Sequence, residues 1–297
     1  MYPLPYIDPV FRPPSEWKSL ILQVTNGCSW NKCTFCDMYR EPQKRFRPKP
    51  VEQIAAEVAA LHRAGYAVQR VFLADGDAMT LSSRWLKEII TVIKTYYPEV
   101  SRISSYCLPR NLKNKSVAEL AELKAMGLNL MYVGCESGDD EVLACVNKGE
   151  TYQSSLEALN KIKAAGMKSS VMLLNGLGGS RLSEQHALNS ARLMNEAQPE
   201  YLSTLVVNFP PGGEAAFAAN FNGRYQKMQL NELFCELYRL LEHLQLNKTI
   251  FRSDHVSNRL VLKGILGRDK PKLLATVQTA IDAPGSIPLR PERRRSL

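Results

Sequence analysis

The chain has 297 residues, of which 45% are hydrophobic and 23% are charged, and its formal net charge is +9. This composition is close to that of an average globular protein, so it supports a sizeable core and excludes disorder throughout. No apolar run approaches the roughly 20 residues that span a bilayer, and the first residues lack the basic and apolar stretches of a signal peptide. We therefore expect a cytoplasmic protein with no membrane partner.

The positive charge bears on the choice of partner. Four of the arginines that contribute to it lie in the last eight residues, at Arg290, Arg293, Arg294 and Arg295. A basic balance favours anionic partners such as nucleic acid, phosphorylated metabolites or carboxylates. It is equally compatible with a soluble protein that has no such partner.

Strand and helix patterns alternate along most of the chain. Residues 1–17 are rich in proline and aromatic side chains and are expected to form an extended N-terminal arm. Beyond them, the hydrophobic pattern predicts six strands, at residues 19–25, 70–74, 102–107, 129–134, 168–174 and 201–207. It predicts helices between them, at residues 51–64, 82–97, 116–126, 139–146, 154–165 and 183–197.

This alternation indicates an α/β fold with parallel strands. Six units are too few for a closed eight-fold barrel, and no Gly-x-Gly-x-x-Gly segment follows the first strand. We predict a partial (β/α)6 TIM-type barrel over residues 18–213, with an open doubly wound sheet as the alternative. Helical patterns at residues 231–244 and 270–283, joined by a less regular stretch at 249–262, predict a mostly helical C-terminal extension over residues 214–297 that covers the barrel. In either architecture, functional residues lie at the carboxyl ends of the strands.

Three of the seven cysteines form a cluster directly after the first predicted strand. Cys28, Cys33 and Cys36 have the spacing C-x4-C-x2-C, and the other four cysteines stand alone. Clustered cysteines in a reducing compartment indicate metal or redox chemistry, and soft thiolates select iron–sulfur clusters, zinc or copper(I). A structural zinc site usually takes its remaining ligands from a second Cys or His pair, and the sequence has none. Three thiolates suit a four-iron cluster with one open iron. The alternatives are a zinc site completed by a distant residue, or three buried apolar cysteines.

The cysteine motif and the six-unit pattern together resemble the radical S-adenosylmethionine (SAM) superfamily. The resemblance covers roughly residues 18–211 and includes Phe35, just before the third cysteine. The Gly-Cys-Glu-Ser segment at residues 134–137 is similar to one in the branch that contains Elongator catalytic subunits, methylthiotransferases and oxygen-independent coproporphyrinogen oxidases. The commonest spacing in the superfamily is C-x3-C-x2-C, so this chain has one more residue between its first two cysteines.

The resemblance implies a cofactor set and a reaction. Cys28, Cys33 and Cys36 would hold one [4Fe–4S] cluster, whose open iron binds SAM. Reductive cleavage of SAM would give methionine and a 5′-deoxyadenosyl radical that abstracts hydrogen from an unidentified substrate. The implied cofactor contacts lie near strand ends, at Phe35, Asp75, Gly76, Asp77, Ser105, Glu136, Ser137, Lys148, Asn175 and Gly176. The substrate-side candidates are Tyr106, Asn208, Arg252 and His255.

Some of these positions also have ordinary structural interpretations. The turn at residues 75–77 would meet the SAM amino group, or it is simply a polar turn. Glu136 and Ser137 would contact ribose hydroxyls or the amino group, or the segment provides an ordinary N-cap at Ser137 or Asp139. Lys148 would pair with the SAM carboxylate, or it is exposed to solvent.

The implied partners are SAM, a small anionic metabolite or an RNA as substrate, and an electron donor such as flavodoxin or ferredoxin. Because the remaining cysteines show no pair spacing, we expect one cluster only. Two other functions stay open: an iron–sulfur electron-transfer or sensor protein without SAM chemistry, and a zinc-bound structural or interaction protein.

Overall fold

The computed structural model describes residues 2–209 and 212–291. The chain forms two compact units. The first unit comprises Met1–Asn31, Cys36–Gly134 and Ala158–Ser169, and the second comprises Lys32–Phe35, Cys135–Glu157 and Ser170–Leu297. The tail residues Arg293, Arg294 and Arg295, and Pro210 and Pro211 near the predicted end of the barrel, lie outside the described residues.

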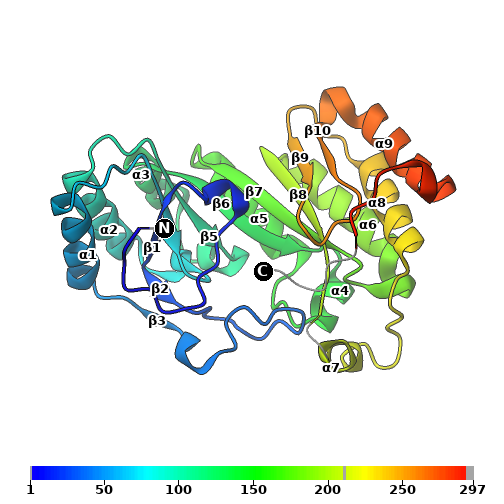
Figure 1. Cartoon of the computed structure of the whole chain (residues 1–297), viewed down its shortest axis with the longest axis horizontal. Helices are drawn as coiled ribbons and strands as arrows, with labels where there is room; N and C mark the ends of the chain where they lie inside the picture. Colours follow the sequence, from blue (N-terminus) through cyan, green and yellow to red (C-terminus); the bar gives the residue numbers. More distant parts are fainter. Residues whose placement is uncertain (1, 210–211, 292–297) are drawn as a thin grey trace. The chain divides into compact units, whose positions relative to one another are not determined.

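Four parallel strands form the centre of the first unit. In sheet order they are β1 (Leu20–Gln23), β4 (Arg70–Ala74), β5 (Arg102–Cys107) and β6 (Leu128–Glu136), the last of which runs into the second unit. The helices α1 (Val51–Arg63), α2 (Ser83–Tyr96) and α3 (Val117–Ala125) alternate with these strands along the chain. Helix α2 packs against both α1 and α3 (Figure 1). A separate two-stranded sheet pairs β2 (Thr25–Asn26) with β3 (Arg47–Pro48) in antiparallel fashion.

Local capping chemistry sets the helix ends in this unit. The Ser82 hydroxyl accepts a hydrogen bond from the Trp85 N–H at 3.2 Å and so begins α2. Ser116 and Glu119 form a capping box at the start of α3. Beyond the other end of α3, Gly127 has a φ of +116°, which a glycine adopts without steric cost. These signals are local, so the predicted helices are confirmed here to within one or two residues.

The second unit also has strands that alternate with helices. In sheet order its strands are β7 (Lys168–Asn175), β8 (Tyr201–Val206), β9 (Ile250–Ser253) and β10 (Leu262–Ile265). The β7–β8 and β8–β9 pairs are parallel, and β10 is antiparallel to β9. The helices are α4 (Asp140–Cys145), α6 (Gly179–Ala197), α7 (Gly213–Ala219), α8 (Leu230–His243) and α9 (Leu266–Asp282), with α5 (Tyr152–Ala164) shared between the units. Helix α8 packs against both α6 and α9 (Figure 1).

Short 3-10 helices lie between these elements and near the two ends of the described chain. They are η1 (Pro14–Glu16), η2 (Pro42–Lys44), η3 (Ala78–Thr80), η4 (Pro109–Leu112) and η5 (Pro284–Ser286). Among the helices of residues 2–209 and 212–291, none is long and apolar enough to cross a membrane.

The predicted N-terminal arm, residues 1–17, makes specific contacts in the first unit. Glu16 in η1 is fully buried and accepts hydrogen bonds from Ser19 Oγ (2.5 Å), Tyr132 Oη (2.6 Å) and Arg102 Nη2 (2.7 Å). Burial alone would raise the pKa of Glu16, but these partners outweigh burial and the pKa is lowered. The end of the arm is therefore anchored to β5 and β6.

The α/β class and the parallel alternation are confirmed, and the C-terminal extension is richer in strands than predicted. The stretch at residues 249–262 contains β9, which continues the strand–helix–strand order for one more unit after β8. The strand β9 has only four residues, and two of them, Arg252 and Ser253, are polar. Its sequence therefore lacks a clear hydrophobic pattern. Helix α9 begins four residues before its predicted start at 270 and contains Pro271. The predicted boundaries after residues 17 and 213 stay predictions.

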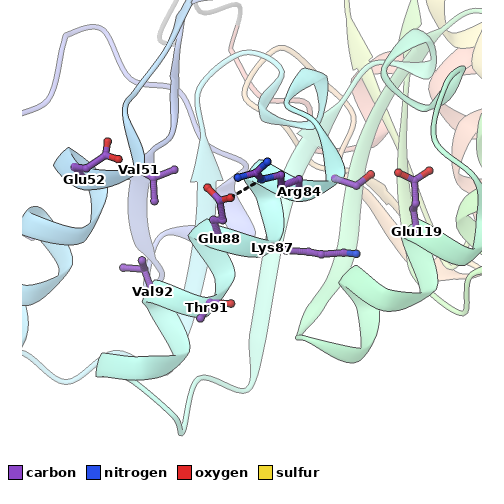
Figure 2. Close-up of a pocket in the computed structure, with 9 residues that line it drawn as sticks. Val51, Glu52, Arg84, Lys87, Glu88, Thr91, Val92 and Glu119 are labelled. Atoms are coloured by element: carbon purple, nitrogen blue, oxygen red, sulfur yellow. Dashed lines mark hydrogen bonds and ion pairs between the residues drawn. The ribbon is translucent and has the colours of Figure 1, made fainter.

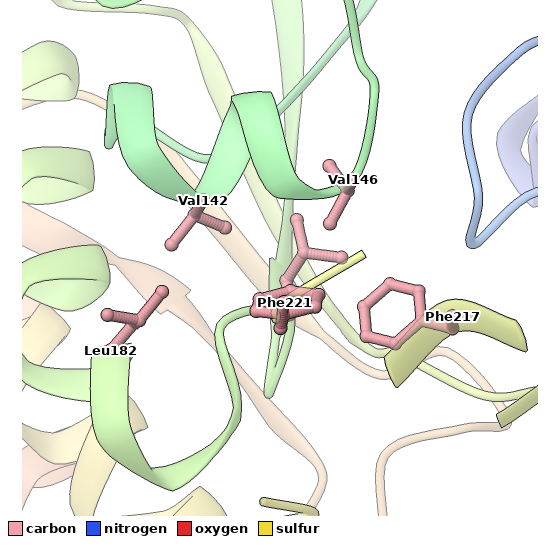
Figure 3. Packing of buried hydrophobic residues seen from close by; sticks show 6 residues of the cluster. Val142, Val146, Leu182, Phe217 and Phe221 are labelled. Atoms are coloured by element: carbon pink, nitrogen blue, oxygen red, sulfur yellow. The ribbon is translucent and has the colours of Figure 1, made fainter. Parts of the chain in front are cut away.

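An apolar cluster lies between the helices of the second unit. Its buried members come from α4, α6, α7 and the turns beside them: Val142, Val146, Leu177, Leu182, Phe217 and Phe221 (Figure 3). Phe35 and Phe209 pack against it from outside. Because Phe35 stands next to the third cysteine, this cluster helps to fix that part of the chain.

Candidate cofactor site

The cysteines lie in a loop, residues 27–46, whose two ends are joined by the β2–β3 pair. The Asn26 side chain donates hydrogen bonds to the carbonyl oxygens of Gln43 (2.6 Å) and Arg45 (2.9 Å). Gly27 has a φ of +71°, and a Cβ at this position would lie 1.9 Å from the Lys44 carbonyl oxygen. Only glycine fits there, so the start of the loop packs directly against its end.

The Asp75–Gly76–Asp77 turn after β4 packs against the first cysteine of this loop. A Cβ on Gly76 would lie 2.9 Å from the Cys28 Cα, which leaves no room for a side chain. Asp77 accepts hydrogen bonds from the Ser29 N–H (3.0 Å), the Ser29 hydroxyl and the Asn111 side chain (3.5 Å). Burial raises the pKa of Asp77, and the Ser29 hydrogen bonds oppose that rise. The turn therefore holds the chain on both sides of Cys28.

Asp75 is fully buried and forms an ion pair with Lys44, whose side chain is also fully buried. It accepts further hydrogen bonds from the Gly27 N–H and the Gln23 side chain, each at 3.3 Å. Burial raises the pKa of Asp75, and the Lys44 cation opposes that rise. The Lys44 ammonium also donates to the Ile7 carbonyl oxygen at 2.9 Å, so it links the N-terminal arm to this turn.

Sequence reasoning missed Lys44. It belongs to a run of basic residues at 44–49 that reads as a solvated surface. Only the pairing of β2 with β3 turns it inward, and a two-residue strand pair has little sequence signature. The predicted contact between Asp75 and the SAM amino group stays a prediction, with Lys44 now known as a neighbour.

In the second unit, the segment that carries Cys33 is held against the end of α4. The backbone N–H and hydroxyl of Thr34 donate to the Val146 carbonyl oxygen at 3.0 and 3.3 Å. The Asn147 side chain donates to the Lys32 carbonyl oxygen at 3.2 Å. These bonds flank Cys33 on both sides, so its position is set by the turn after α4.

The same turn brings a buried cation close to Cys33. The Lys148 ammonium lies 2.9 Å from Glu136 Oε1, with both side chains buried, and 5.8 Å from the centre of the Phe35 ring. Burial alone would lower the pKa of Lys148, but the charges of Glu136 and Cys33 outweigh burial and raise it. Glu136 has a φ of +64°, a strained conformation for a residue with a side chain. The sequence placed both residues at the site but did not predict that they pair.

Ser137 and Gly176 belong to one buried polar network in the second unit. Ser137 Oγ lies 2.8 Å from His186 Nδ1 and accepts a hydrogen bond from the Asp139 N–H at 2.9 Å. The Gly176 N–H donates to Glu236 Oε1 at 2.6 Å, and that oxygen lies 4.0 Å from His186 Nε2. The N-cap of α4 is Asp139, which accepts from the Val142 N–H. Neither His186 nor Glu236 was singled out from the sequence.

The other predicted residues have varied surroundings. In the first unit, the Ser105 hydroxyl is buried and donates to the Leu73 carbonyl oxygen at 3.1 Å. The Tyr106 ring packs edge-on against Phe72, and burial raises the pKa of Tyr106. In the second unit, the Asn175 carbonyl oxygen accepts from the Val207 N–H at 3.0 Å.

Of the substrate-side candidates, Asn208 and His255 lie beyond the carboxyl ends of β8 and β9. His255 Nδ1 lies 2.9 Å from the Ser257 hydroxyl, and burial lowers the pKa of His255. Arg252 is different, because it lies within β9 with an exposed side chain, opposite Lys263 on β10. The roles of all these residues stay predictions.

A hollow of about 600 Å³ occupies the outer faces of α1, α2 and α3. Glu52, Lys87 and Glu119 are among its lining residues, and Arg84 pairs with Glu88 at 3.0 Å on its wall (Figure 2). None of the predicted site residues lines it. In the part of the chain that the structure describes, no three His, Cys, Asp or Glu side chains are arranged to hold a single metal ion. The assignment of the three cysteines therefore depends on their motif and on the family.

Comparisons with known proteins identify that family. An uncharacterised methyltransferase of Pyrococcus horikoshii is 29% identical over 147 residues, which is 50% of this chain and 30% of that protein. A Methanocaldococcus jannaschii protein provisionally named a methylthiotransferase is 25% identical over 268 residues, 84% of this chain and 58% of that protein. The chain thus spans less than two thirds of the length of these relatives.

Coproporphyrinogen III oxidase from Escherichia coli, whose structure is described as that of a radical SAM enzyme, has the same fold. The two structures agree with a TM-score of 0.57 at 19% identity, over 75% of this chain and 52% of that one. The family model of the radical SAM superfamily matches residues 22–194, which is more than half of the sequence. The chain therefore belongs to the radical SAM superfamily of enzymes.

Proposed function

We propose that this radical SAM enzyme binds one [4Fe–4S] cluster through Cys28, Cys33 and Cys36 and cleaves SAM reductively. When bound, the cluster supplies the electron that splits SAM into methionine and a 5′-deoxyadenosyl radical, which abstracts hydrogen from the substrate. The protein's task is to hold the thiolates, orient SAM and exclude water.

The motif and the family carry this proposal, and the surroundings of Cys28 and Cys33 support it. The Asn31 N–H donates to Cys28 Sγ at 3.5 Å, and the buried Lys148 cation lies within electrostatic reach of Cys33. Hydrogen-bond donors and cations both favour the thiolate over the thiol, and the thiolate is the form that binds iron. The residues present therefore fit an anionic cluster with cysteine ligands.

The Lys148–Glu136 pair suits the amino-acid end of SAM. That end is a zwitterion, with a carboxylate for Lys148 and an ammonium group for Glu136. Both side chains are buried, and Lys148 Nζ lies 2.9 Å from Glu136 Oε1. The pair therefore holds a positive and a negative charge at fixed, neighbouring positions. We propose that this pair binds the methionine portion of SAM.

The test is anaerobic reconstitution with iron and sulfide, followed by dithionite reduction in the presence of SAM. Chromatography should then detect 5′-deoxyadenosine and methionine. Cys33→Ala should abolish both products and lower the bound iron. Cys235→Ala is the matched control, because Cys235 is an exposed cysteine on α8 that is not part of the motif, and this variant should behave like the wild type.

Two results would overturn the proposal. If a fully loaded cluster yields no 5′-deoxyadenosine and SAM leaves its EPR spectrum unchanged, the protein is an electron-transfer or sensor protein. If the reconstituted protein binds zinc in preference to iron, it is a structural zinc protein. The substrate is a small anionic metabolite or an RNA, and the salt dependence of substrate affinity separates these, because RNA affinity falls steeply with ionic strength.

A further inference from the structure

A buried polar network joins two segments of the proposed SAM site in the second unit. Ser137, His186 and Glu236 are at most 3% exposed. Ser137 follows Glu136 at the end of β6, and Gly176 follows β7, so both lie where strand-end ligands are expected. His186 comes from α6 and Glu236 from α8, which are distant in sequence and packed together.

Two hydrogen bonds and one longer contact join the members of this network. The Asp139 N–H occupies one lone pair of Ser137 Oγ. Glu236 accepts a hydrogen bond from the Gly176 N–H at 2.6 Å. Burial raises the pKa of Glu236, and His186, the Gly176 N–H and the Ser183 side chain oppose that rise. His186 Nε2 faces Glu236 across 4.0 Å. On the other side of the ring, Nδ1 and the Ser137 hydroxyl form a hydrogen bond of 2.8 Å, and the tautomer of His186 sets which atom donates.

Helix α8 also fixes Gly176 by packing. Gly176 has a φ of +79°, and a Cβ there would lie 2.8 Å from Leu233 Cδ2 on the same helix. Glu236 and Leu233 are one turn apart, so one face of α8 both holds the Gly176 N–H and closes against its Cα. Helix α8 therefore contacts both the N–H and the Cα side of Gly176.

We infer that Glu236 and His186 are positioning residues of the SAM site, acting through Gly176 and Ser137. This inference rests on the proposed function. It assigns α8 a role in positioning the cofactor, although α8 lies outside the residues that the family model matches. Neither residue touches the reacting atoms. They set the backbone and hydroxyl positions that SAM meets.

Two substitutions of His186 each remove a different contact of this side chain. In His186→Asn, the amide replaces Nδ1 and keeps the contact with Ser137 but not the one with Glu236. In His186→Gln, the amide reaches the Nε2 position and keeps the opposite contact. We expect each to raise the Kd of SAM by about tenfold, the size of one lost buried polar interaction. Kd is measured by equilibrium dialysis of labelled SAM against the reconstituted protein.

Two substitutions of Glu236 test whether a conservative replacement restores SAM binding. Glu236→Ala should weaken SAM binding at least as much, whereas in Glu236→Gln the amide oxygen still accepts from the Gly176 N–H and should recover part of the affinity. Glu242→Ala, an exposed carboxylate near the end of the same helix, is the matched control and should bind SAM like the wild type. In the two His186 variants and in Glu236→Ala, the KM for SAM should rise, and kcat should change much less.

The outcomes separate the inference from the proposed function. If the wild type holds its cluster but neither binds SAM nor forms 5′-deoxyadenosine, the proposed function fails. If the wild type binds SAM, and both His186 variants bind it equally well while melting at lower temperature, the network is merely structural and the inference is wrong.

Discussion

Lys148 and Glu136 form a buried ion pair with 2.9 Å between the ammonium and the carboxylate. Glu136 also has a strained backbone conformation, with a φ of +64°. Removing one member of a buried ion pair leaves an uncompensated charge, which is more damaging than removing both.

We therefore expect Lys148→Met to lower the free energy of unfolding of the metal-free protein by about 3 kcal/mol. The double variant Lys148→Met, Glu136→Gln should recover most of that loss, because the remaining group is neutral. Urea unfolding under anaerobic conditions measures both. Equal losses in the single and double variants would contradict the interpretation that the charges are coupled.

Glu16 gives a pH-dependent prediction. Its folded-state pKa is lowered below the ordinary value of 4.5, so the folded protein holds its proton less tightly than the unfolded chain does. The corresponding stability is present above about pH 4.5 and is lost as pH falls through the folded pKa. We expect Glu16→Gln to remove the part of the fall in melting temperature at low pH that comes from protonation of Glu16. Glu99→Gln, at an exposed carboxyl, should keep the wild-type acid profile of melting temperature.

Among the elements, the turn after β4 and the start of the cysteine loop form one packed unit through Gly76. A methyl group there would collide with the Cys28 backbone, which cannot move like the end of a flexible side chain. We expect Gly76→Ala to lower the iron and sulfide bound per chain after reconstitution. Gly285→Ala should bind the wild-type amount, because a Cβ at Gly285 meets nothing within 4 Å.

Sequence patterns identified the elements whose signals are local. The bounds of β4 and β5 are as predicted, and Ser82 and Ser116 cap their helices, because alternation and capping depend on neighbouring residues. The β9 strand was missed because four residues with two polar members carry little pattern. The Cys28–Cys33–Cys36 motif was visible because spacing alone defines it.

The partners of the site residues needed the fold. Lys44 and Asp75 are 31 positions apart, and Ser137 and His186 are 49 apart, so no local signal connects them. Sequence reasoning therefore proposed which residues serve the cofactor, and the structure adds which protein groups hold those residues in place.

At the scale of the whole molecule, the net charge of +9 bears on electron delivery. The family implies a reductant, and we propose a flavodoxin or ferredoxin for this role. A basic enzyme attracts an acidic donor over roughly a Debye length. We expect the flavodoxin-driven rate of 5′-deoxyadenosine formation to fall several-fold between about 0.05 and 0.5 M ionic strength. With excess dithionite as reductant, the rate should change much less, and an equal loss with both would mean that salt acts on the enzyme itself.

The β2–β3 pair gives the loop that carries the cysteines fixed ends. For a loop with fixed ends, one additional residue changes the closure entropy by only about 0.05 kcal/mol in a loop of some 20 residues. Closure entropy therefore does not oppose the fourth intervening residue between Cys28 and Cys33. What constrains the interval between the thiols is the set of hydrogen bonds that hold the chain beside each of them.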